Sequence, residues 1–136
     1  MPRFVVADRS MEPALVDGDR LRCTRLHGIP PRGAIAVFVH PLIPDFWLVK
    51  RVVGLPGERI DLDFGELLVD GRPGLDRWGH GATFPEGRWL VGPDAAFVLS
   101  DNRSLTIDDS RRFGPVPIKG MLIATRRSRR RRTTRR

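Results

Sequence analysis

One serine and one lysine in this chain have surroundings that suit a nucleophile and a general base. Lys50 lies in the stretch DFWLVKRVVGLPG, within an apolar run over residues 46–55 that only Lys50 and Arg51 interrupt. The chain has 24 lysine and arginine residues together, and Lys50 and Lys119 are the only lysines. Because arginine keeps its proton in proteins whereas lysine can lose it, the lysine in this run is a candidate for a neutral amine.

The chemistry of Lys50 depends on where its amine lies. In a strand it shares a face with Leu48 and Val52, and apolar neighbours lower the pKa of an amine from its free value of about 10.4. A general base works best at about 7–8, a shift of about three units or roughly 4 kcal/mol, which partial burial can supply. The alternative is a lysine whose ammonium reaches solvent along the apolar surface. The run alone leaves both interpretations open.

The candidate nucleophile is Ser10, in the stretch DRSMEPAL directly after an apolar segment. Pro13 removes a backbone donor and predicts a turn from which the serine projects. Serine is a poor nucleophile until a neighbouring base takes its proton, and lysine serves as that base in known variants of the serine triad. The three histidines, which would be the usual bases, lie in loop segments without a recognisable setting and are expected at the surface: His27, His40 and His80.

The net charge of +8 invites a nucleic-acid interpretation, but its distribution does not support one. The last eleven residues, RRSRRRRTTRR, hold eight arginines and no acid, and the rest of the chain has as many basic as acidic residues. We therefore predict a folded domain over residues 1–125 and a disordered arginine-rich tail over residues 126–136. Nucleic acid or an anionic surface would contact this tail only non-specifically.

Other features bound the class of protein. The single cysteine, Cys23, permits no disulfide within the chain and has no partners for a metal site, so neither a metal nor another cofactor is expected. No stretch has the ~18 apolar residues of a membrane span, and the first ten residues are too weakly apolar for a secretory signal. We expect a cytoplasmic protein without a membrane span.

The hydrophobic pattern predicts a mostly β protein. Short apolar or alternating segments are separated by glycine- and proline-rich turns, and no segment sustains a helical period. A DG turn follows a predicted hairpin, and residues 73–88 are expected to form a surface excursion. The predicted strands cover residues 3–7, 20–26, 34–39, 46–55, 59–64, 66–73, 88–92, 95–101 and 120–125.

Three segments resemble motifs of the S26 serine peptidases, the family of signal peptidase I. They are SMEPAL, VKRVVGLPGE and SDNRSLTIDDSRRFGPV, and they occur in the family order between residues 8 and 116. The resemblance implies a signal peptidase I/LexA-like fold of antiparallel β-sheets with a partly barrel-like core. It also implies a serine endopeptidase with a Ser–Lys dyad.

The resemblance assigns roles by position. Ser10 matches the nucleophile, its backbone N–H the oxyanion donor, and Lys50 the general base. The remaining matches are residues that brace the site in the family: Asp101, Asn102, Asp109 and Arg111.

Several positions depart from the family pattern. Asp8 stands where the family often has a serine that completes the oxyanion hole, and an ionised carboxylate there would oppose a developing oxyanion. Ser100 replaces a glycine, and the loop that follows it is one residue longer than usual. The serine that hydrogen-bonds the lysine amine in the family is matched by Thr106, with Ser104 as the second choice.

Among S26 peptidases, the chain is most similar to the small form that matures nickel-type superoxide dismutase by removing a leader from its precursor. The resemblance thus implies that precursor as the partner. Signal peptidase I-like processing of exported precursors is an alternative. Two further interpretations remain open. One is a LexA-like, self-cleaving regulator that associates with nucleic acid, and the other is an inactive scaffold, which Asp8 suggests.

Overall fold

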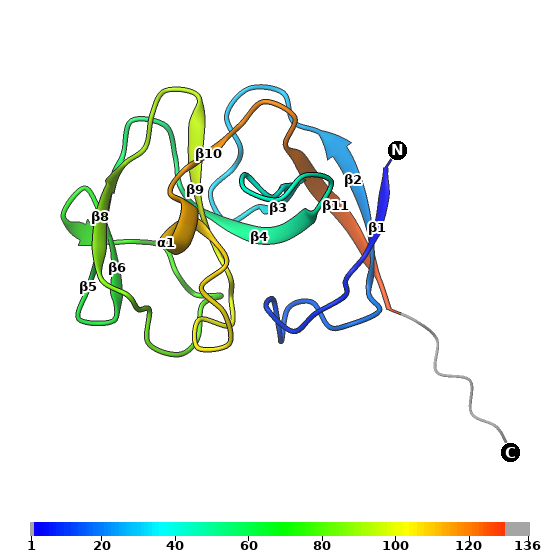
Figure 1. The fold of residues 1–136 in the computed structure, drawn as a ribbon, viewed down its shortest axis with the longest axis horizontal. Helices are drawn as coiled ribbons and strands as arrows, with labels where there is room; N and C mark the ends of the chain where they lie inside the picture. Colours follow the sequence, from blue (N-terminus) through cyan, green and yellow to red (C-terminus); the bar gives the residue numbers. More distant parts are fainter. Residues whose placement is uncertain (1, 130–136) are drawn as a thin grey trace, which may run out of the picture.

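The computed structural model describes residues 2–129, which form two antiparallel β-sheets and one short helix (Figure 1). Residue 1 and residues 130–136 lie outside the described residues. The elements are β1 (Arg3–Val5), β2 (Arg20–Arg25), β3 (Ile35–Val39), β4 (Trp47–Gly54), β5 (Arg59–Asp63), β6 (Glu66–Val69), β7 (Arg72–Pro73), β8 (Gly87–Leu90), β9 (Ala95–Leu99), α1 (Ser110–Phe113), β10 (Val116–Pro117) and β11 (Leu122–Ser128).

The larger sheet has seven strands in the order β1-β2-β11-β3-β4-β9-β10, and the smaller has four in the order β7-β6-β5-β8. Figure 1 shows the smaller sheet on the left and β1, β2 and β11 on the right, with β4 and β9 running between them. The predicted mostly β fold with antiparallel sheets is confirmed, but neither sheet closes into a barrel. In the larger sheet, β1 and β10 are open edges.

Three apolar clusters fill the fold, each built from the inward face of alternating strands. One lies under β1 and β2 around Met11 and Leu21, a second under β3, β4 and β9 around Val52 and Val98, and a third between the sheets around Phe97. The first two include residues of β3 or β4, so these strands are buried on both faces. Any charged side chain in the middle of β4 must therefore enter the protein interior.

The predicted strands are present except that the one predicted over residues 66–73 is divided into β6 and β7, and the hairpin of β5 and β6 is confirmed by their pairing. The DG turn also forms: Asp70 and Gly71 both have positive φ, and the chain folds back so that β6 pairs with β7. The last strand continues three residues beyond the predicted boundary at 125, because Arg126 and Ser128 pair with Arg22 and Arg20 of β2. The rest of the predicted tail, from residue 130 onward, lies outside the described residues.

No helix within residues 2–129 is long and apolar enough to cross a membrane.

Candidate active site

Lys50 lies in the interior of the fold, at the centre of β4. Its residue is only 2% exposed, and on its strand face Leu48 and Val52 are also buried. The Nζ atom donates a hydrogen bond at 3.0 Å to the Oγ atom of Ser100, the residue directly after the end of β9. Ser100 is itself fully buried. The amine therefore does not reach solvent along the apolar surface, which decides between the two interpretations that the sequence left open.

Burial lowers the pKa of the Lys50 amine, because an apolar environment disfavours the ammonium form. The carboxylates of Asp109, Asp8 and Asp108 oppose this shift, and the nearby Arg111 guanidinium adds to it. The net direction remains downward, so burial outweighs the three negative charges. A neutral amine, which a general base requires, is thus more accessible here than on a free lysine.

Ser10 lies in a turn after β1 that Asn102 holds in place. The backbone N–H of Asn102 donates to Ser10 O at 2.9 Å, and its side-chain amide donates to Arg9 O at 3.3 Å. Met11 is fully buried beneath the turn, and Ser10 is 3% exposed. By position, Asn102 matches a residue that braces the site in the family. Its two hydrogen bonds fix the backbone that carries Ser10.

The Asp8 side chain turns toward Ser10. Its Oδ1 atom accepts a hydrogen bond from the Ser10 hydroxyl at 2.7 Å and another from the Ser10 backbone N–H at 2.9 Å. The Asp8 carboxylate also acts electrostatically on Lys50. In this state the Ser10 hydroxyl donates to Asp8 and the Lys50 amine to Ser100, and among residues 2–129 no described hydrogen bond joins the two side chains.

Asp109 and Arg111 form a fully buried ion pair behind Ser100. Arg111 Nη2 lies 2.7 Å from Asp109 Oδ2, and both side chains are completely inaccessible to solvent. The same Oδ2 atom accepts from the Ser100 backbone N–H at 3.0 Å, while Oδ1 caps the start of α1 by accepting from Arg111 N. The pair thereby positions Ser100, and through it the Lys50 amine.

A family model described as signal peptidase, peptidase S26 matches residues 1–127. The chain belongs to this family. A signal peptidase I from Bacillus caldolyticus is 38% identical over 133 residues, which cover 85% of this chain and 71% of the relative. One from Leptolyngbya laminosa is 30% identical over 130 residues, covering 86% of this chain and 63% of the relative. Members of the S26 family of signal peptidase I are serine endopeptidases.

A solved structure supports the fold. A crystal structure of a signal peptidase I from Enterococcus faecalis V583 matches with a TM-score of 0.59 and 25% identity, covering 68% of this chain and 92% of that chain. Curated S26 relatives are longer: the chain spans 63% of the Leptolyngbya protein and 67% of signal peptidase I P from Bacillus subtilis subsp. natto. The latter is 28% identical over 125 residues, or 82% of this chain.

Within this S26 site, one sequence assignment needs correction. Thr106 and Ser104 were matched to the residue that hydrogen-bonds the lysine amine, but Ser100 makes that contact. Thr106 Oγ1 instead accepts from Asp108 N at 3.0 Å and stabilises the loop, and Ser104 is exposed. Ser100 stood out in the sequence only as a replacement for a glycine. A hydroxyl where the family has a glycine was the sequence feature that could have identified Ser100 as the partner of the Lys50 amine.

Arg51 lies on the opposite face of β4 from Lys50 and pairs with Asp101, as strand alternation requires. Its Nη2 atom lies 2.6 Å from Asp101 Oδ2, and its guanidinium covers the Trp78 ring at 4.7 Å from the centroid. Burial raises the pKa of the Asp101 carboxyl, and the hydrogen bond from Arg51 opposes that shift. Asp101 thus braces the strand through Arg51 and contacts neither Ser10 nor Lys50 through its side chain.

Arg103 is a second buried arginine, which the sequence interpretation did not single out. It pairs with Asp76 at 2.5 Å, donates to Thr83 Oγ1 at 2.9 Å and donates to the Ser100 carbonyl oxygen. Asp76 and Thr83 belong to the predicted surface excursion. This excursion is therefore tied to the Ser100 loop, and it helps to hold the S26 site together.

Of the histidines, His27 and His80 are exposed, as predicted, whereas the prediction is wrong for His40. His40 is 3% exposed; its Nε2 lies 2.9 Å from Asp108 Oδ1, and its Nδ1 accepts from Leu42 N. His80 Nε2 lies beside Glu12 O. No histidine has a described contact with the Ser10 hydroxyl, and residues 2–129 hold no cluster of metal-binding side chains.

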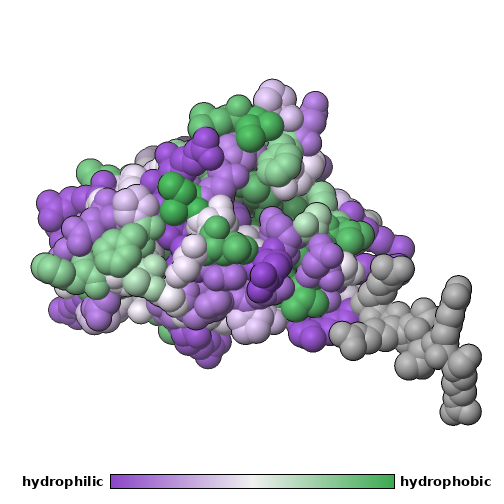
Figure 2. Space-filling view, turned by 60° about the horizontal axis from the view of Figure 1, so that its bottom comes forward, coloured by the Kyte–Doolittle hydropathy of each residue, from purple (hydrophilic) through white to green (hydrophobic). Residues whose placement is uncertain are grey.

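A small cavity lies beside the S26 site, between β1 and the start of β4. It has a volume of about 150 Å³, and its walls are mainly apolar. Exposed apolar side chains lie at this point, including Phe46 at the end of the β3–β4 connection and Trp47 at the start of β4. Figure 2 shows hydrophobic side chains in patches among hydrophilic ones on the face it presents. The cavity is lined by Phe4, Val5, Val6, Ala7, Asp8, Met11, Phe46, Trp47, Leu48 and Val49.

Proposed function

We propose that this S26 protein is a serine endopeptidase that removes an N-terminal leader from a precursor, with Ser10 as nucleophile and Lys50 as general base. The observation that carries the proposal is the Lys50 amine. It is buried, its pKa is lowered, it donates to Ser100, and the Asp8 carboxylate that accepts from Ser10 acts on it electrostatically. A lysine kept in this way costs stability, and a chemical task would account for that cost.

In the proposed reaction, the neutral Lys50 amine takes the hydroxyl proton of Ser10 as its Oγ attacks the scissile carbonyl. The Ser10 backbone N–H donates to the oxyanion that forms. Lys50 then protonates the leaving amine and, in a second half-reaction, activates the water that hydrolyses the acyl-enzyme. Because Asp8 holds both the N–H and the hydroxyl of Ser10, its carboxylate must first swing away. Asp8 is exposed, so a rotation into solvent is open to it.

Three variants test the catalytic assignment. Ser10→Ala and Lys50→Met are each expected to abolish precursor cleavage while the variants remain folded. Lys119→Met is the matched control, because Lys119 is the other lysine of the chain and is exposed. Cleavage by Ser10→Ala at the normal rate would refute the assignment. Loss of activity in Lys119→Met would show that lysine removal acts through something other than the site.

For the substrate, we propose the precursor of nickel-type superoxide dismutase. The support is the resemblance of the three motifs to the small S26 form that matures this enzyme. The apolar cavity of about 150 Å³ beside Asp8 and Met11 fits a small apolar side chain next to the scissile bond. A cytoplasmic site of action belongs to the same proposal, and fractionation of the host cells tests it.

Processing of exported precursors is the second candidate, favoured because the matched relatives are signal peptidases I. Incubation of the protein with the superoxide dismutase precursor and, separately, with a secretory preprotein distinguishes the two. Sequencing the new N-terminus identifies the bond. Cleavage of the dismutase precursor alone supports the first substrate, and cleavage of the preprotein alone supports the second.

A further inference from the structure

The outer face of β1, β2 and β11 carries a row of arginines that face one another across the strands. Arg3 of β1 is directly opposite Arg22 of β2, and Arg22 is directly opposite Arg126 of β11. Adjacent strands lie about 4.8 Å apart, and like charges at opposed positions destabilise a sheet. We call Arg3, Arg22 and Arg126 the arginine row. Repulsion among these residues lowers the stability of the sheet, and a further role would account for their presence.

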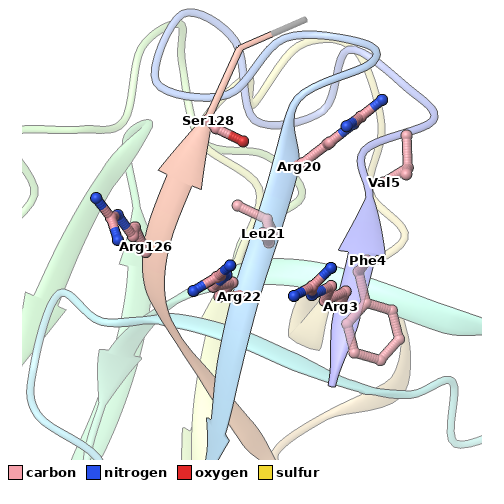
Figure 3. Close-up of a pocket in the computed structure, with 8 residues that line it drawn as sticks. All are labelled: Arg3, Phe4, Val5, Arg20, Leu21, Arg22, Arg126 and Ser128. Carbon is pink, nitrogen blue, oxygen red and sulfur yellow. The ribbon is translucent and has the colours of Figure 1, made fainter. Parts of the chain in front are cut away.

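Within residues 2–129, no carboxylate forms a salt bridge with any member of the arginine row or with the adjacent Arg20. The buried arginines within residues 2–129 are all paired, as Arg103 and Arg111 illustrate. Figure 3 shows Arg126, Arg22 and Arg3 side by side across the three strands, around a hollow of about 470 Å³. The hollow thus offers several free guanidinium groups to an anionic ligand.

The hollow lies next to the proposed substrate cavity. Phe4 and Val5 line both the hollow and the cavity beside Asp8 and Met11. A ligand that extends out of the cavity over β1 therefore reaches Arg3 first. This continuity favours an extended chain over a flat bilayer or a nucleic-acid duplex, since neither of those enters a cavity of about 150 Å³.

The edge of β1 is open to such a chain. Cys23 N donates to Pro2 O and Val6 N donates to Asp19 O, so residues 2 and 6 direct their hydrogen bonds toward β2. Because this direction alternates along an antiparallel strand, Arg3 and Val5 direct their N–H and C=O groups to the free edge. An extended peptide can pair with these groups as an added strand.

We propose that the arginine row is an exosite for acidic side chains of the polypeptide substrate, which pairs with the free edge of β1. The inference rests on the proposed protease function. A residue of the added strand opposite Arg3 lies on the same face as the row, and its carboxylate continues the line of guanidinium groups with the opposite charge. Guanidinium groups bind carboxylates through two parallel hydrogen bonds, which suits this pairing.

The test compares two peptides and two proteins. The peptides are a cleavable substrate with glutamates in the segment that pairs with β1, and the same peptide with glutamines there. The proteins are the full chain and the double variant Arg22→Gln/Arg126→Gln; Arg88→Gln, an exposed arginine on β8 in the other sheet, is the control. The full chain is expected to cleave the glutamate peptide with a KM about two- to fivefold lower than that for the glutamine peptide. The double variant is expected to show equal KM values for the two peptides at an unchanged kcat. The Arg88→Gln control is expected to keep the difference in KM.

Equal KM values for the two peptides with the full chain would overturn the exosite. Binding is measured separately, by fluorescence anisotropy of labelled, uncleaved peptides with Ser10→Ala protein, so failure of the protease function does not hide the result. A single-stranded oligonucleotide and phosphatidylglycerol vesicles serve as competing anions. If the double variant loses affinity for either of these but not for the glutamate peptide, the row serves that anion and the proposal is wrong. Unfolding of the double variant at an equal or higher temperature confirms that it is folded.

Discussion

Asp8 and Ser10 are joined through one carboxylate oxygen, which accepts from both the hydroxyl and the backbone N–H of the serine. These are the two groups that an acyl transfer needs, one as nucleophile and one as oxyanion donor. The described state is therefore self-blocked. Since Asp8 also raises the pKa of Lys50 against the effect of burial, it opposes the proposed reaction in two independent ways.

Replacing Asp8 with serine should make the enzyme faster. The change frees the Ser10 N–H and hydroxyl from a charged acceptor, and hydrogen bonds of that kind contribute about 1.5–3 kcal/mol, so kcat should rise roughly tenfold or more. It also removes a negative charge that raises the pKa of Lys50. Since the active base is the neutral amine, the rising limb of the pH–rate profile should move to lower pH.

Initial cleavage rates over a pH series measure both effects, with Asp17→Ser, an exposed acid in the following turn, as the control. A slower Asp8→Ser enzyme would contradict the self-blocked interpretation and would indicate instead that Asp8 takes part in proton transfer.

Removing the Ser100 hydroxyl should slow the reaction without weakening substrate binding. Ser100→Ala deprives the Lys50 amine of its described partner, so kcat should fall by about tenfold to a hundredfold while KM stays constant. Ser100 accepts from the ammonium form and favours it, so its loss should also move the pH profile to lower pH. A purely structural role would leave that profile in place, and Ser100→Thr should restore part of the rate.

The buried lysine should lower stability at neutral pH. Because the pKa of Lys50 is lower in the folded protein than in the unfolded chain, the unfolded chain binds more protons between these two values. Stability therefore rises with pH across that window. Lys50→Met should be more stable than the natural chain at neutral pH, and the difference should shrink as pH approaches about 10.4. Urea unfolding at several pH values measures it; a constant difference would mean that charge burial is not its source.

Breaking the pair behind Ser100 should be costly. Asp109→Ala leaves Arg111 buried without its acid and the Ser100 N–H without its acceptor, which predicts a loss of about 3–5 kcal/mol of unfolding free energy. Arg88→Ala, which removes an exposed partner of Asp61, should cost less than about 1 kcal/mol. Urea unfolding of both variants gives the comparison. Equal losses would show that burial of the Asp109 pair adds nothing.

The strands could be predicted because apolar segments and glycine-rich turns are local signals, and the S26 motifs matched Ser10 and Lys50 to a nucleophile and a base by position. The open sheets could not be predicted, since they depend on which strands meet at long range. The same reason applies to Arg103, whose acid Asp76 lies 27 positions away along the chain.

The role of Ser100 was missed for a different reason. Position matching assigned the amine's partner by counting along a loop that is longer than usual, whereas the contact depends on where β9 ends beside β4. His40 shows the same limit: its loop context predicted exposure, yet Phe46 and Phe113 pack against its ring.

The side-by-side placement of Lys50 and Arg51 has a consequence for how this protein can change over time. Lys50 enters the candidate site and donates to Ser100, whereas Arg51 pairs with Asp101 on the opposite face of the strand. Deleting a single residue early in β4 would bring Arg51 to the position of Lys50, so that a permanent cation would stand where the titratable amine belongs, and inserting one would bring Val49 there. Side chains along this strand can vary, but its length up to Lys50 cannot, and natural insertions should collect in the loops on either side.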